Sequence, residues 1–273
     1  MTKNILTLLC CLLLGGVLYA AEEKQAGERM TLTINEVEYA FRWCPPGTFT
    51  MGSPESEWDP LGGEPQHEVT LTKGFWMQET EVTQEMWESV TGKNPSKFKE
   101  SKKLPVETVS WDDCQKYIKK LNAMDAAPEG YKFSLPTEAQ WEYACRAGTT
   151  TAFHFGDVLN GDKANHDGKY PYGTEKKGNN LEKTTVAGSY PANAWGLYDM
   201  HGNVAEWCLD WYDDYPGGSV TDPTGPSSGE VRVYRGGCWS SYGYYCRSAD
   251  RGCIEPDYGD FCFGMRLTMI PSN

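Results

Sequence analysis

Apolar and polar residues alternate in several short runs, each bounded by glycine, proline or charged residues. An alternation with a period of two predicts β-strands that bury one face. Because turn-forming residues separate the runs closely, we expect hairpin strands rather than βαβ units. The predicted strands are residues 31–35, 39–43, 68–71, 74–77, 232–235 and 263–268.

Three other segments show signals for helices, and each begins with a capping residue. Thr83 precedes the first segment. Ser110 and Asp113 have the spacing of a capping box, and so do Thr137 and Gln140. In such a box the hydroxyl accepts from a backbone N–H three residues on, and the side chain there reaches back to the cap. We therefore predict three helices that start directly after these caps.

Between these elements the chain is rich in residues that break regular structure. It has 29 Gly and 16 Pro, with 10 Trp and 16 Tyr scattered among them. Residues 159–183 and 213–230 have the composition of long surface loops. The whole pattern predicts an irregular, loop-rich α+β fold with short antiparallel strands and about three helices.

The N-terminus has the order of a secretory signal. Lys3 precedes an apolar run over residues 5–18, and small alanines follow at positions 20 and 21. The run is shorter than the roughly 20 residues that span a bilayer. We expect residues 1–21 to be a signal peptide and residues 22–273 to form one exported domain, periplasmic or secreted. A retained membrane anchor is the alternative, because signal and anchor differ mainly in the length of the apolar run.

The chain is acidic, with 25 Lys and Arg against 38 Asp and Glu and a formal net charge of −13. We identify no basic cluster in the mature chain, and a protein of this net charge is repelled by phosphate backbones and by anionic lipid surfaces. We therefore expect no nucleic-acid partner and no membrane contact after signal cleavage. We also expect a monomer.

Eight of the ten cysteines remain once the signal is removed. An even number in an oxidising compartment favours disulfides over metal binding, and no C-x-x-C pair of the kind found in zinc sites is present. A local bridge between Cys253 and Cys262 and a bridge between Cys208 and Cys238 are both open, because connectivity cannot be read from spacing alone. The eight are Cys44, Cys114, Cys145, Cys208, Cys238, Cys246, Cys253 and Cys262.

A series of short blocks along the chain resembles the sulfatase-modifying factor family, which includes the formylglycine-generating enzymes. The most specific blocks are LPTEAQWEYA at 135–144 and NAWGLYDMHGNVAEW at 193–207. The others occur in the family's order at residues 47–52, 67–71, 81–83, 105–111, 235–239, 247–251 and 263–266. The resemblance covers about residues 42 to 268 and implies the family's C-type-lectin-like α+β fold.

The family's enzymes oxidise a sulfatase cysteine to formylglycine with O₂ and a copper ion held by two thiolates, which suit Cu(I). The resemblance places these thiolates four and nine residues after the second glycine of a Gly-Gly motif, here Gly237. Ser241 occupies the first position, and Cys246 at the second directly precedes the 247–251 block. Cys246 therefore resembles the family's structural cysteine, which implies a Cys145–Cys246 disulfide and no bound copper. A rebuilt pair of Cys238 and Cys246 is the alternative, so Cys238, Ser241 and Cys246 are the candidate catalytic residues.

The segment from Asp199 to Glu206 brings two carboxylates and several turn carbonyls within eight residues. Hard oxygen donors at such spacing suit Ca²⁺. The resemblance implies a structural Ca²⁺ held by the side chains of Asp199 and Glu206 and the carbonyls of Gly202 and Val204.

Two classes of function remain open. In the first, the chain is a binding module for a protein, peptide or glycan, with Trp239, Tyr242, Tyr244 and Tyr245 as contact residues, because exposed aromatic side chains suit such surfaces. In the second, it is an enzyme, either a diverged sulfatase activator or an oxidase similar to the exported family member that acts in pyoverdine maturation without the copper cysteines. The residues do not decide whether the chain is catalytic.

Overall fold

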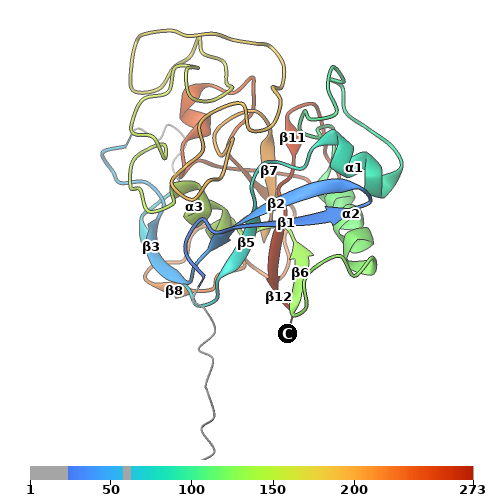
Figure 1. The fold of residues 1–273 in the computed structure, drawn as a ribbon. Helices are drawn as coiled ribbons and strands as arrows, with labels where there is room; N and C mark the ends of the chain where they lie inside the picture. The colour runs from blue at the N-terminus through green and yellow to red at the C-terminus, as the bar shows by residue number, and fades with distance from the viewer. Residues whose placement is uncertain (1–23, 58–62, 273) are drawn as a thin grey trace, which may run out of the picture.

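Three small sheets and three α-helices carry the part of the chain that the structure describes, residues 24–57 and 63–272 of a computed structural model (Figure 1). The predicted signal peptide, residues 1–21, lies outside the described residues. Within these residues, no helix has both the length and the apolar character needed to cross a bilayer.

The largest sheet has five strands in the order β1-β2-β5-β12-β6, all paired antiparallel. It joins the two ends of the described chain, because β12 near the C-terminus lies between β5 and β6. The strands are β1 (Arg29–Ile34), β2 (Val37–Cys44), β5 (Phe75–Gln78), β6 (Tyr131–Ser134) and β12 (Thr268–Pro271).

The two smaller sheets have the orders β10-β9-β7-β11 and β3-β4-β8. Each contains one parallel pair, β11 with β7 and β4 with β8, and is otherwise antiparallel. The strands are β3 (Gly47–Met51), β4 (His67–Leu71), β7 (Ala205–Trp211), β8 (Val220–Thr221), β9 (Arg232–Arg235), β10 (Arg251–Ile254) and β11 (Phe263–Gly264).

Five of the six predicted strands are present to within a few residues, and the sixth is wrong. Residues 263–268 do not form one strand but contribute β11 to one sheet and β12 to another. Arg266 lies between them and is fully buried. Its guanidinium donates to backbone carbonyls and to a carboxylate of other segments, so the chain leaves one sheet here and enters the next.

The three predicted helices are confirmed as α1 (Gln84–Thr91), α2 (Trp111–Ala123) and α3 (Glu138–Arg146). Thr83, Ser110 and Thr137 each cap the start, and each hydroxyl accepts from the backbone N–H three residues on. A short 3₁₀-helix, η1 (Gly243–Cys246), follows β9. The α+β fold with short, mostly antiparallel strands is confirmed.

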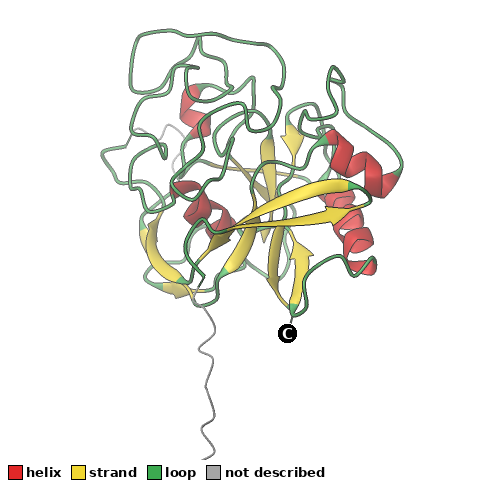
Figure 2. Ribbon diagram, viewed as in Figure 1, coloured by secondary structure: helices red, strands yellow, loops and turns green. Residues whose placement is uncertain are grey.

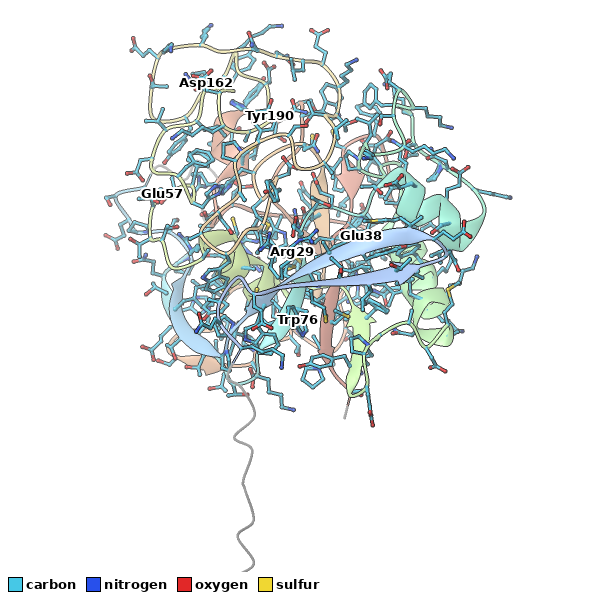
Figure 3. The ribbon with its side chains drawn as sticks, in the orientation of Figure 1. Arg29, Glu38, Glu57, Trp76, Asp162 and Tyr190 are labelled. Atoms are coloured by element: carbon cyan, nitrogen blue, oxygen red, sulfur yellow. The ribbon has the colours of Figure 1, made fainter. Side chains whose placement is uncertain are left out.

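Loops dominate one side of the molecule. The chain from α3 to β7 contains no α-helix or strand, and it forms much of the upper part of the view in Figure 2. Asp162 and Tyr190 of this segment lie there, well away from Trp76 in the large sheet (Figure 3). Residues 147–204 and the segment 236–250 together form what we call the loop face.

Candidate functional site

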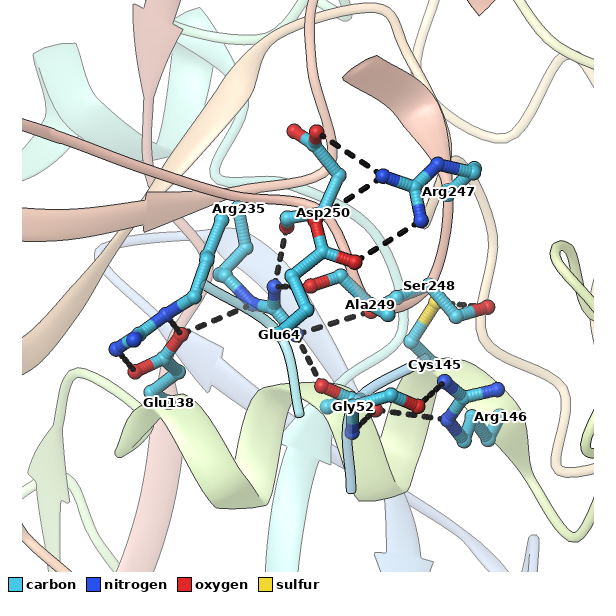
Figure 4. A network of polar contacts seen from close by, with 12 residues as sticks. Gly52, Glu64, Glu138, Cys145, Arg146, Arg235, Arg247, Ser248, Ala249 and Asp250 are labelled. Atoms are coloured by element: carbon cyan, nitrogen blue, oxygen red, sulfur yellow. Dashed lines mark hydrogen bonds and ion pairs between the residues drawn. The ribbon is translucent and has the colours of Figure 1, made fainter. Parts of the chain in front are cut away.

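One buried arginine holds the loop face to α3 (Figure 4). Arg235 at the end of β9 is 1% exposed. Its guanidinium forms an ion pair with Glu142 of α3 and also donates to the backbone carbonyls of Ser248, Ala249 and Asp250. These three carbonyls have no neighbouring strand to donate hydrogen bonds to them. The guanidinium of Arg235 supplies those donors instead.

Glu142 connects the same centre to the N-terminal part of the chain. Its carboxylate accepts from the backbone N–H of Gly52 at 2.9 Å and from Nε of Arg146 at 2.8 Å. Burial opposes ionisation, yet the charges of Arg146 and Arg235 hold the pKa of Glu142 below its usual range. The carboxylate therefore stays charged and joins β3, α3 and β9.

Tyrosines gather on the outer side of the loop face. The rings of Tyr170 and Tyr242 are stacked with centroids 4.0 Å apart, and those of Tyr244 and Tyr245 are also 4.0 Å apart. Tyr242 bridges the two pairs, and its side chain and that of Tyr170 are 39% and 49% exposed. We call these four residues the tyrosine cluster. It brings together three of the four predicted contact residues and adds Tyr170, which the sequence reasoning did not single out.

Trp239, the fourth predicted contact residue, packs in a separate aromatic corner. Its indole N–H donates to the carbonyl of Phe261 at 3.0 Å, and its ring meets that of Phe98 edge-on at 5.6 Å. The ammonium of Lys97 lies 4.0 Å from the centroid of the Phe261 ring. Trp239 is half-buried, so it links segments and also shows part of its ring.

The segment beside this corner is basic. Residues 93–103 contain five lysines, all exposed, and a single acidic residue, Glu100. The net charge of −13 hides this local excess, which is why sequence reasoning missed it; a window of about ten residues would have found it. The lysines are Lys93, Lys97, Lys99, Lys102 and Lys103.

Cys238 lies against Cys262 rather than against Cys208 or Cys246. The two sulfur atoms are 2.6 Å apart, and Oγ of Ser240 lies 3.2 Å from one and 3.3 Å from the other. The hydroxyl of Ser241 accepts from the backbone N–H of Cys238 at 2.9 Å, which closes a turn. Of the three candidate catalytic residues, Cys238 and Ser241 are therefore brought together.

Cys145 and Cys246 are both fully buried and stand as free thiols in this structure, so the bridge between them stays a prediction. His201 connects their surroundings. Its Nδ1 bonds to the carbonyl of Cys246 at 2.7 Å, and its Nε2 accepts from the backbone N–H of His154 at 3.2 Å. Burial lowers the pKa of His201 well below its ordinary value. The imidazole is therefore neutral, and it links the segments that carry the two cysteines.

The segment from Asp199 to Glu206, which is predicted to bind calcium, holds its two carboxylates in different ways. Both oxygens of Glu206 accept from Arg266, at 2.7 to 3.1 Å, and one also accepts from the indole of Trp141 at 2.7 Å. Asp199 accepts from the backbone N–H of Gly188. Glu206 therefore has its lone pairs occupied, whereas Asp199 keeps capacity for a further partner.

A third acid, Glu81, adds to this buried group. It is 0% exposed, no N–H group among the described residues donates to its Oε2, and its side chain shares a hydrogen bond with that of Asp199. Burial first, and then the charge of Asp199, raise the pKa of Glu81. Oxygen donors for a cation are thus present at Asp199 and Glu81, and Glu206 joins them only if it releases a hydrogen bond from Arg266.

A pocket of about 300 Å³ opens at another part of the molecule, between α3 and the segment 213–226. Glu138 lines it and binds Arg251 with both oxygens, at 2.8 and 2.6 Å. Asp210 lines it too and accepts from the backbone N–H of Glu138 at 2.9 Å. Burial, and then the charge of Glu138, raise the pKa of Asp210 to about 7. Sequence reasoning missed this pocket because its residues come from separate segments.

A model of the sulfatase-modifying factor enzyme 1-like domain matches residues 34–269. The formylglycine-generating enzyme of Mus musculus is 32% identical over 210 residues, which cover 73% of this chain and 52% of that protein. The chain thus spans about half the length of this relative. Among solved structures, Treponema denticola variable protein 1 is 29% identical with a TM-score of 0.76, covering 89% of this chain and 99% of that one. PvdO from Pseudomonas aeruginosa is 25% identical with a TM-score of 0.75, covering 90% and 99%.

Replacing Arg266 tests the buried ion pair. Arg266→Met leaves Glu206 as an uncompensated buried charge, and we expect a loss of about 3–5 kcal/mol in the free energy of unfolding, measured by denaturant titration. In the double variant Arg266→Met/Glu206→Gln the charge is gone, so the total loss should be smaller than the sum of the two single losses. Losses that simply add would show that the two side chains are not coupled.

Asp210 predicts a pH dependence. The folded state keeps its proton up to about pH 7, whereas the unfolded chain releases it near pH 4, so the stability from this group falls as pH rises between these values. Relative to Asp210→Asn, the natural protein should lose on the order of 1–3 kcal/mol between pH 4 and 7.5. Urea titrations across this range measure the difference, and parallel pH profiles for the two proteins would contradict it.

Proposed function

The chain belongs to the sulfatase-modifying factor enzyme 1-like family, and from this premise we propose that it is an exported member that recognises a polypeptide on its loop face without copper-dependent formylglycine chemistry. Export is supported by the order of charged, apolar and small residues over positions 1–21.

The observation that carries this proposal is the environment of Ser241. The family resemblance expects a copper thiolate at this position, and a hydroxyl is a poor ligand for Cu(I). Here the hydroxyl closes a turn with the backbone of Cys238, and the Cys238 sulfur faces Cys262. Cys246, the other expected ligand position, is fully buried and adjoins Gly237. These positions therefore support a structural use of sulfur.

The loop face also offers a surface for recognition. The tyrosine cluster presents flat rings and hydroxyl groups, which provide contact area with little loss of conformational entropy. The segment 93–103, with five exposed lysines, reaches the Trp239 corner through Lys97 and Phe98 and supplies positive charge in an acidic protein. Exposed aromatic rings on the loop face, together with a basic segment at the Trp239 corner, favour a polypeptide that carries acidic side chains as the ligand.

An oxidase that works without the copper cysteines is a second candidate. It is supported by the likeness to PvdO, which extends over 90% of this chain. Such an enzyme would modify its bound polypeptide, whereas a binding module would release it unchanged. Mass spectrometry of the polypeptide after incubation separates the two.

Binding is tested with a displayed random-peptide library selected on residues 22–273. We expect selected peptides to be enriched in acidic and aromatic residues, and Tyr170→Ala/Tyr242→Ala to weaken their affinity by roughly tenfold or more because it removes the exposed stack. Lys97→Glu should weaken it further through charge. Met124→Ala is the matched control, since Met124 is 42% exposed at the end of α2 and should have no effect.

Three results would contradict the proposal. One is equal affinity of the natural protein and the tyrosine variant for the selected peptides. Another is enrichment of no peptide together with binding to a glycan array. The last is copper-dependent conversion of cysteine to formylglycine in a sulfatase-derived peptide, which would restore the family's usual chemistry.

Calcium remains a proposal for the loop that contains Asp199, with the carbonyls of Gly202 and Val204 as further donors. When the free Ca²⁺ concentration is one hundred times the Kd, binding stabilises the folded state by about 2.7 kcal/mol. We expect added Ca²⁺ to raise the unfolding midpoint of the natural protein, a chelator to reverse the increase, and Asp199→Ala to abolish it. Asp213→Ala, an exposed acid elsewhere, is the control. If Ca²⁺ raised the unfolding midpoint of Asp199→Ala as much as that of Asp213→Ala, the ion would bind at another site.

A further inference from the structure

Cys238 and Cys262 are not bonded in this structure, yet their sulfur atoms are closer than two separate thiols normally approach. Non-bonded heavy atoms in proteins settle at about 3.5–4.0 Å, and sulfur is larger than carbon. The two sulfur atoms here are 2.6 Å apart, although their residues are 24 positions apart in the chain. An arrangement this close places the two side chains where a covalent bond between the sulfurs is the natural outcome.

Neighbouring hydrogen bonds hold both backbones in place. The N–H of Cys238 donates to Ser241, and the N–H of Cys262 donates to Asp260 at 2.8 Å. The carbonyl of Cys262 accepts from Ala205 at 2.8 Å, which attaches it to the start of β7. The indole of Trp239 joins the same two segments through the Phe261 carbonyl. The sulfurs therefore meet because the backbones are positioned independently of them.

We propose that Cys238 and Cys262 form a reversible disulfide that ties the loop face to the connection between β10 and β11 and exchanges with external thiols at Cys262. The assignment does not depend on the proposed function, because it concerns the covalent state of the chain and not its ligand. Its consequence for the tyrosine cluster does rest on that function, since Cys238 and the cluster lie on one segment.

Formation of the bond requires a disulfide donor, either a dithiol–disulfide oxidoreductase or a small disulfide such as oxidised glutathione. The thiolate of one cysteine attacks the donor, forms a mixed disulfide and releases one donor thiolate. The second cysteine loses its proton to solvent, attacks the first sulfur and releases the other donor thiolate. Two thiols are thereby oxidised by two electrons, and the donor's disulfide is reduced to two thiols.

The surroundings of the two sulfurs are unequal. Cys262 is partly exposed, whereas the side chain of Cys238 is 5% exposed. Hydrogen bonds to its sulfur, first from Cys262 and then from the serine hydroxyls at 240 and 241, lower the pKa of Cys238 to about 7 against the effect of burial. In reduction, an external thiolate attacks Cys262, and Cys238 departs as a thiolate that the hydroxyls of Ser240 and Ser241 stabilise, since Cys262 in the mixed disulfide has no S–H left to donate. Exchange therefore proceeds at Cys262.

The oxidised chain should have a more rigid loop face than the reduced chain. The bond closes a loop that runs from Cys238 to Cys262 and contains both η1 and β10. Reduction leaves hydrogen bonds alone to hold the segment that carries Tyr242 and its neighbours, among them those of Trp239 with Phe261, of Gly243 with Tyr170 and of Cys246 with His201. The redox state of the surroundings then controls how firmly this surface is presented.

The first experiment is peptide mapping of the natural protein, purified without reductant and alkylated before digestion. We expect the Cys238 and Cys262 peptides to be joined, with a mass lower by two hydrogen atoms than their sum, and to separate after reduction. Cys253→Ser is the matched control, because Cys253 is exposed in β10, between the two cysteines in the chain, and its loss should not change the pair. Full alkylation of both cysteines, a Cys253–Cys262 link, or a metal ion co-purifying with the pair would overturn the proposal.

The asymmetry is tested by labelling with a bulky thiol reagent. Cys262 in the Cys238→Ser variant should react at least about tenfold faster than Cys238 in the Cys262→Ser variant, because access outweighs thiolate content. Hydrogen exchange over residues 238–246 should be faster in the Cys262→Ser variant than in the oxidised natural protein, with residues 111–123 of α2 unchanged; the variant keeps Cys145 and Cys246, so the difference reports this bond alone. Equal labelling rates would contradict the proposal that external thiols react at Cys262. Unchanged hydrogen exchange would contradict the proposed effect of the disulfide on the loop face. Failure of peptide selection with these results intact would count only against the proposed function.

Discussion

The pairing of Arg235 with Glu142 is the interaction on which the loop face depends. A chain with few strands leaves many backbone carbonyls without a partner, and burying them unpaired costs more than most side-chain contacts return. Arg235 meets three such carbonyls at residues 248–250 while its charge is balanced by a carboxylate on α3 (Figure 4). Removing either partner would leave the other charge buried and the segment unsupported.

Two further arginines apply the same solution elsewhere. Arg266 pairs with Glu206 and donates to carbonyls of residues 78, 79 and 198, and Arg247 pairs with Glu64 at 2.9 and 3.0 Å. All three guanidinium groups are buried and belong to different blocks of the family pattern. The planar guanidinium suits this role because it offers five donors in one rigid group and keeps its charge. Arginine thus replaces the hydrogen-bond ladders that a regular fold would use.

The buried arginine–carboxylate pairs separate residues that hold the fold together from residues that meet solvent. The paired arginines and acids are buried, while exposed or partly exposed loops carry the tyrosine cluster, the lysines of residues 93–103 and Cys262. A scaffold that satisfies its own polar groups tolerates changes in the loops it displays, so one family fold can carry different chemistry. Ser241 is an example of such a change. It closes a turn with Cys238, which faces Cys262 of a distant segment, and the buried arginine pairs keep their contacts.

The sequence alone determined the features that depend on neighbours in the chain. The caps Thr83, Ser110 and Thr137 act over three residues, so spacing was enough to place the helices. The blocks of the family pattern likewise identified the fold. Only the tertiary structure decided which distant residues meet: Cys238 with Cys262, Glu81 with Asp199, and Arg266 between β11 and β12. Spacing carries no information about such pairs, because long loops leave their separation in space to the packing of the whole chain.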